Sequence, residues 1–174
     1  FSSQAHFLAR SLGSTGLSML VNEQLRVALA TVDLPISEVT GLINKQLIID
    51  KVTAVQHALK RDFRISNPRV AVLALNPQIG NESQEGSEET EIIAPAISEL
   101  KNSGIATFGP YAADDFFAYA DYEHFDAVLA MYYDQGAIPF KLLGENESVC
   151  YTAGLPMEHT EPGHSPAFDI AGKG

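Results

Sequence analysis

Two short, continuous apolar runs constrain the fold of this chain most strongly. Residues 69–75 read RVAVLAL and residues 126–131 read DAVLAM, and residues 25–31, LRVALAT, have the same character. A strand with one face in water alternates apolar and polar residues, so runs without alternation indicate strands that are buried on both faces, as in a parallel sheet. Residues 16–21 and 104–108 are weaker strand candidates.

Helical periodicity separates these runs. Residues 44–62 and 87–102 each place apolar side chains at helical spacing, with Ser87 as a candidate N-cap and Gly104 placed to end the second helix. Alternating strands and helices predict an α/β fold, a three-layer sandwich with a mostly parallel sheet. Because no linker, repeat or low-complexity tract divides the 174 residues, we expect a single domain over residues 1–174.

The composition limits which partners the protein can bind and indicates its cellular compartment. Eleven basic against 22 acidic residues give a net charge of −11, which opposes binding to a nucleic-acid backbone. No apolar run approaches the roughly 20 residues of a membrane span, and we expect no membrane partner. One cysteine and the lack of a signal-peptide pattern favour the cytoplasm, and a start at Phe1 indicates a fragment of a longer protein.

Candidate ligand-binding residues follow the predicted strands. The loop from Asn76 to Ser87 joins a strand to a helix, so it is expected at the carboxyl edge of the sheet, where open α/β folds bind ligands. Its backbone could hold a phosphate at the helix N-terminus, but Glu82 and Glu85 would repel an anion. The alternative is a solvated acidic loop.

The segment after the 126–131 strand carries a second set of candidates. Asp134 can act as a general base, a metal ligand or a helix N-cap, and Lys141 can bind an anion or remain solvated. A metal site is also conceivable in a later loop that contains two histidines and two glutamates, namely Glu158, His159, Glu161 and His164.

Five segments together resemble the 4-hydroxythreonine-4-phosphate dehydrogenase (PdxA) family. They read LRVALATVDLP, VAVLALNPQIG, AVLAMYYDQGAIPFK, TAGLP and DIAGKG, in the family's order, and correspond to its second half. The resemblance implies a homodimeric, two-domain α/β enzyme related to isocitrate and isopropylmalate dehydrogenases, of which residues 1–174 are a fragment. Such an enzyme uses NAD to oxidise a phosphorylated hydroxy-amino acid, and a divalent metal (Zn, Mg or Co) at the dimer interface polarises the reacting hydroxyl.

The same resemblance implies that the metal site is altered. The family holds its metal with three histidines, and this chain has Asp33, Gln78 and Tyr133 at those positions. An aspartate can ligate a hard cation, but an amide is a weak ligand, and phenols ionise only well above neutral pH. We therefore expect no bound metal at these three positions.

Substrate-side positions are partly retained. Asp114, Asp134 and Lys141 match residues on the substrate side of the family's site, and we take them as the catalytic candidates. Cys150 stands where the family has an asparagine, and His159 where it has a phosphate-binding arginine.

These substitutions favour a PdxA-like domain that is catalytically inert and carries no cofactor, either as a natural pseudoenzyme or as a redesigned scaffold. Two alternatives stay open. One is an active, divergent NAD-dependent dehydrogenase of a phosphorylated hydroxy acid. The other is a non-catalytic binding or scaffold domain that uses the acidic residues 82–91. A homodimer is possible in each case.

Overall fold

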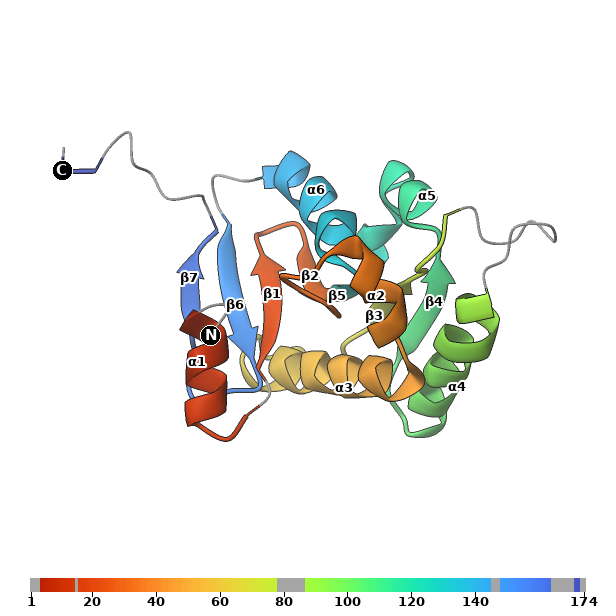
Figure 1. Cartoon of the computed structure of the whole chain (residues 1–174), viewed down its shortest axis with the longest axis horizontal. Coiled ribbons are helices and arrows are strands. Elements are labelled where there is room, and N and C mark those ends of the chain that lie inside the picture. Colours follow the sequence, from red (N-terminus) through yellow and green to blue (C-terminus); the bar gives the residue numbers. More distant parts are fainter. Residues whose placement is uncertain (1–3, 15, 78–86, 145–147, 164–170, 173–174) are drawn as a thin grey trace.

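A single seven-stranded sheet organises the fold, as the computed structural model shows (Figure 1). The structure describes residues 4–14, 16–77, 87–144, 148–163 and 171–172. The strands lie in the order β4-β3-β5-β2-β1-β6-β7. Their bounds are β1 Leu17–Val21, β2 Arg26–Leu29, β3 Val70–Leu73, β4 Thr107–Tyr111, β5 Ala127–Ala130, β6 Val149–Ala153 and β7 Thr160–Pro162.

The strand directions confirm a mostly parallel sheet. β3 pairs in parallel with both β4 and β5, and β5 pairs in parallel with β2. β1 is antiparallel to its neighbours β2 and β6, and β7 is antiparallel to β6. The strands β2 to β6 therefore run in one direction, and only β1 and β7 run against it.

Both faces of the central strands are buried, which explains the continuous apolar runs. In β3, Val70 and Val72 belong to one core cluster, whereas Ala71 and Leu73 belong to the other. The first cluster contains residues of α3 and α4, and the second contains residues of α5 and α6. Figure 1 shows these two pairs of helices on opposite sides of the sheet, so the three-layer prediction is confirmed.

The two predicted helices form, with one difference. α3 (Lys45–Arg61) matches the prediction closely, and the side chain of Asn44 caps it by accepting a hydrogen bond from the Leu47 N–H at 2.9 Å. The second helix is not α-helical throughout, because a π-helical turn, η1 (Glu89–Ile93), precedes α4 (Ala94–Asn102). The next strand also begins later than predicted, since Gly104 (φ 81°) lies in the turn that ends α4.

Several elements have no counterpart among the sequence predictions. They are α1 Gln4–Ser11, α2 Ile36–Leu42, α5 Ala113–Ala118, the 3-10 turn η2 Asp121–His124, α6 Tyr133–Gly144 and strands β6 and β7. No helix in the described residues is both long enough and apolar enough to cross a membrane.

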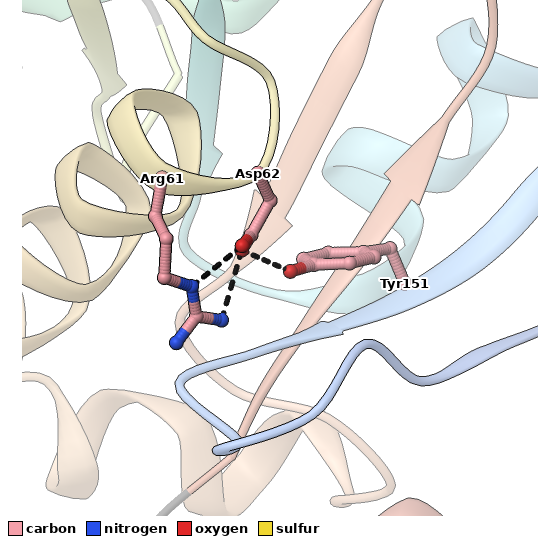
Figure 2. A network of polar contacts seen from close by, with 3 residues as sticks. All are labelled: Arg61, Asp62 and Tyr151. Carbon is pink, nitrogen blue, oxygen red and sulfur yellow. Dashed lines mark hydrogen bonds and ion pairs between the residues drawn. The ribbon is translucent and has the colours of Figure 1, made fainter.

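A polar network ties the end of α3 to β6 (Figure 2). The Arg61 guanidinium donates hydrogen bonds to both carboxylate oxygens of Asp62, at 2.5 and 3.0 Å, and the Tyr151 hydroxyl donates to the same carboxylate. The Tyr151 ring also packs edge-on against Phe63, with the ring centroids 5.4 Å apart. These contacts join the helix layer to the antiparallel part of the sheet.

Candidate functional site

Three adjacent parallel strands end side by side at one edge of the sheet. Because β3, β5 and β2 are neighbours, the residues that follow them come together although they are far apart in the sequence. One direct link is the hydrogen bond from the Thr31 hydroxyl, after β2, to the Met131 carbonyl, after β5, at 2.7 Å. This carboxyl edge is where open α/β sheets bind their ligands.

Gln135 holds the ends of β3 and β5 together. Its side-chain oxygen accepts a hydrogen bond from the Met131 N–H at 2.7 Å, and its side-chain amide donates to the Ala74 carbonyl at 2.7 Å. Gln135 lies in the first turn of α6, so the same contacts fix the start of that helix against the edge.

Glu89 fixes the segment after β3 by hydrogen bonds to Leu75 and Asn76. Its carboxylate accepts hydrogen bonds from the backbone N–H groups of Leu75 and Asn76, at 2.8 and 2.9 Å, and from the Asn76 side chain at 3.0 Å. Glu89 is only 4% exposed. The sequence placed Glu89 in the predicted helix 87–102 without indicating that it is buried, because the π-helical turn that carries it inward left no recognisable sequence signal.

Asp33 and Tyr133 border the same hollow at this edge. A cavity of about 350 Å³ is lined by Thr31, Val32, Asp33, Leu34, Ile36, Val39, Tyr132, Tyr133 and Asp134. A smaller cavity of about 130 Å³ shares Val32, Asp33 and Tyr133 with it and extends to Ser18, Met19, Leu20, Leu29, Cys150, Tyr151, Thr152 and Glu161. We refer to the two cavities together as the Asp33 crevice.

The residues of this crevice do not fit a zinc centre of the usual kind. Such centres use imidazole, thiolate and carboxylate donors in tetrahedral geometry. Asp33, Asp134 and Glu161 supply carboxylates, Cys150 a thiol and Tyr133 a phenol, but no imidazole lines either cavity in the described part of the chain. Gln78, the third predicted position, lies outside the described residues. Among the residues that the structure describes, no three His, Cys, Asp or Glu side chains form a metal-binding group.

Asp114 and Asp134 meet at a separate, largely apolar groove. Together with Gln135 they line a hollow of about 330 Å³ between α5 and α6, whose other walls are Ala113, Phe117, Tyr132, Ile138, Pro139 and Leu142. Asp134 is the second residue of α6, so the interpretation of Asp134 as an N-cap is wrong. Tyr132 and Asp134 also border the Asp33 crevice, which places the two hollows next to each other.

Lys141 lies further along α6 and is not among the residues that line these three hollows. It is close enough to Cys150 for its positive charge to act on the thiol. The pKa of Cys150 is nevertheless raised, chiefly by burial and secondly by the negative charge of Glu161, and Lys141 opposes this shift.

His159 lies beside β6 and close to Glu161. Its Nδ1 lies 3.1 Å from the Thr152 hydroxyl, and its Nε2 lies 3.6 Å from a carboxylate oxygen of Glu161. Its side chain is 13% exposed. His164 lies outside the described residues, so the four-residue metal loop stays a prediction.

The fold and this edge define an α/β protein that carries a crevice at the carboxyl edge of a mostly parallel sheet, and comparisons with known proteins identify its family. The family model described as pyridoxal phosphate biosynthetic protein PdxA matches residues 1–174. The 4-hydroxythreonine-4-phosphate dehydrogenase of Bacteroides thetaiotaomicron is 49% identical over 162 residues, which cover 93% of this chain and 44% of that protein. The enzyme of the same name from Erythrobacter litoralis is 44% identical, over 98% of this chain and 52% of its own length. The chain therefore belongs to the PdxA family.

Solved structures agree with this assignment. The 4-hydroxythreonine-4-phosphate dehydrogenase of Klebsiella pneumoniae has a TM-score of 0.85 and 32% identity, covering 98% of this chain and 52% of that one. A terephthalate 1,2-cis-dihydrodiol dehydrogenase from Burkholderia xenovorans has a TM-score of 0.82 and 27% identity, with coverages of 98% and 55%. The chain spans about half the length of the relatives that it matches.

Proposed function

We propose that this chain is the part of a PdxA-like dehydrogenase that carries the metal and substrate positions, and that it does not support the family's metal-dependent oxidation. One observation carries the proposal: Asp33 and Tyr133, at two of the three expected metal positions, line the same crevice. They bring to it one carboxylate and one phenol in place of two imidazoles.

The chemistry explains why these substitutions matter. A metal bound at a reacting hydroxyl lowers its pKa and stabilises the charge that develops as hydride leaves for NAD. Losing this effect costs several kcal/mol in the transition state, which is about a thousandfold in rate. Asp114, Asp134 and Lys141 are our proposed substrate-side residues, and the first two line one groove.

Zinc titration of the chain by calorimetry tests the proposal. We expect no saturable binding at micromolar zinc for the chain as it is. The triple variant Asp33→His, Gln78→His, Tyr133→His should gain micromolar binding if these positions form the site. Micromolar binding by the unmodified chain that disappears in Asp33→Ala would overturn the proposal.

A second candidate function is oxidation of a different hydroxy compound with NAD. The similarity to the Burkholderia xenovorans enzyme favours it, because that protein is named for a dihydrodiol substrate that carries no phosphate. The full-length protein, assayed for NAD reduction with phosphorylated and unphosphorylated hydroxy compounds, distinguishes the two candidates. Turnover of an unphosphorylated substrate would favour this second function.

A scaffold function through the acidic residues 82–91 stays an alternative, but Glu89 would not take part in it. Glu89, near the middle of the described part of this segment, is buried and hydrogen-bonded to the chain itself, so it is not available to a partner. A homodimer remains our expectation for the intact protein, and sedimentation of that protein as a strict monomer at high concentration would contradict it.

A further inference from the structure

The Asp33 crevice has a consistent electrostatic character. Its ionisable lining consists of Asp33, Asp134 and Glu161 together with tyrosines and Cys150, and no lysine, arginine or histidine lines it in the described residues. The carboxylates of Asp33 and Asp134 also have no hydrogen-bond or ion-pair partner among the residues that the structure describes. Glu161 differs, because His159 lies 3.6 Å away. The uncompensated charge is therefore concentrated in the larger cavity.

Aromatic and aliphatic walls accompany this charge. Tyr132 and Tyr133 line the larger cavity, and the faces of aromatic rings attract cations. The same cavity has aliphatic walls, contributed by Leu34, Ile36 and Val39. A volume of about 350 Å³ is within the range of small-molecule sites.

The positive charge of Lys141 does not reverse this pattern. Lys141 acts on Cys150, which lines the smaller cavity, and it is not part of the lining of either cavity. An anion in the larger cavity would lie between Asp33 and Asp134 with no lining cation to balance it. A cation there would have two carboxylates and two phenol rings around it.

We propose that the Asp33 crevice binds a small organic cation, an amine or guanidine on a short aliphatic stem, in place of a phosphorylated ligand. The charged end lies between Asp33 and Asp134, and the stem lies against Leu34, Ile36 and Val39. The inference rests on the proposed function in one respect, namely that these positions no longer hold a metal, which would itself bring positive charge into the crevice.

Titration with agmatine, followed by backbone amide shifts in NMR at low salt, tests this inference. We expect saturable shifts at Asp33 and Tyr133, and none there with inorganic phosphate. The double variant Asp33→Asn, Asp134→Asn should bind agmatine roughly fivefold to tenfold more weakly, since each exposed charge contributes modestly. The matched control, Asp115→Asn with Glu123→Gln, removes the same charge from exposed positions outside the crevice and should leave the affinity unchanged.

Three results would overturn the inference. The first is the absence of saturable agmatine shifts at the crevice in the folded chain. The second is equal weakening in the crevice variant and the control, which would show a general charge effect. The third is saturable phosphate binding at Asp33 and Tyr133. These readouts are independent of zinc affinity, so failure here differs from failure of the proposed function, which the zinc titration reports.

Discussion

The Tyr151 hydroxyl donates a hydrogen bond to the carboxylate of Asp62, 89 positions earlier in the chain. Tyr151 lies in β6 and Asp62 follows the last residue of α3, so the bond connects two layers of the fold. Burial, and secondly the hydrogen bond to Asp62, raise the pKa of Tyr151 from its ordinary 10.0 to about 12. The protonated phenol is therefore the form that the folded state favours.

This relationship predicts a loss of stability at alkaline pH. Between pH 10 and about 12 the unfolded chain releases the Tyr151 proton while the folded chain retains it, so the free energy of unfolding should fall. Tyr151→Phe should remove that part of the pH dependence and cost about 1–2 kcal/mol at neutral pH, since it deletes a bond to a charged acceptor. Urea unfolding at several pH values measures both effects. An unchanged alkaline slope in Tyr151→Phe would contradict the prediction.

Asp62 should make stability depend on pH at the acidic end. The hydrogen bond from Arg61, and to a smaller extent that from Tyr151, hold the pKa of Asp62 below its ordinary 3.8 against the opposing effect of burial. The resulting stabilisation is present above pH 3.8 and is lost as pH falls from there through the folded-state pKa. Acid unfolding of Asp62→Asn should show a weaker dependence over this range, and the exposed control Asp115→Asn should match the unmodified chain.

Replacing Glu89 should destabilise the edge that follows β3. Glu89→Ala leaves the N–H groups of Leu75 and Asn76 without their acceptor, which we expect to cost about 2–4 kcal/mol. Glu89→Gln keeps one acceptor oxygen and should cost less. Thermal or urea unfolding measures which of the two variants loses more stability. Glu91→Ala is the control, because Glu91 is exposed and its replacement should change stability by less than about 0.5 kcal/mol. Equal losses in Glu89→Ala and Glu91→Ala would contradict the assigned role.

Two glycines in helices should respond in opposite directions to alanine. A Cβ atom at Gly136, in α6, would lie 2.5 Å from Val27 Cγ1 and 3.0 Å from Ala130 Cβ, so Gly136→Ala should cost about 1–3 kcal/mol. Gly41, in α2, has no neighbouring atom within 4 Å, and Gly41→Ala should stabilise by about 0.4–1 kcal/mol. Melting temperatures of the two variants test the pair. Equal effects would show that packing of α6 on β2 does not decide the outcome.

The central strands could be predicted from sequence because their signal is local. Val70, Ala71, Val72 and Leu73 are all fully buried, and a strand buried on both faces needs apolar residues at every position. The helix α6 could not be predicted in the same way. It contains Gly136 and Pro139, which favour turns in an isolated segment, and its close packing on Val27 and Ala130 explains why a glycine is required.

The candidate site was likewise predictable from the sequence only in part. Residue types were evident from the sequence: an aspartate, a glutamine and a tyrosine where the family has histidines, and acidic residues in excess of basic ones. The grouping of these residues was not evident from the sequence, since Asp33 and Tyr133 are 100 positions apart. They line one cavity because β2 pairs in parallel with β5, with Val27 opposite Val128. Local patterns determined that the segments of β2, β3 and β5 form strands, and they determined which chemical groups the chain carries. Only the tertiary structure decided which groups share a crevice and that Glu89 is buried, because strand order and helix packing depend on contacts between distant segments.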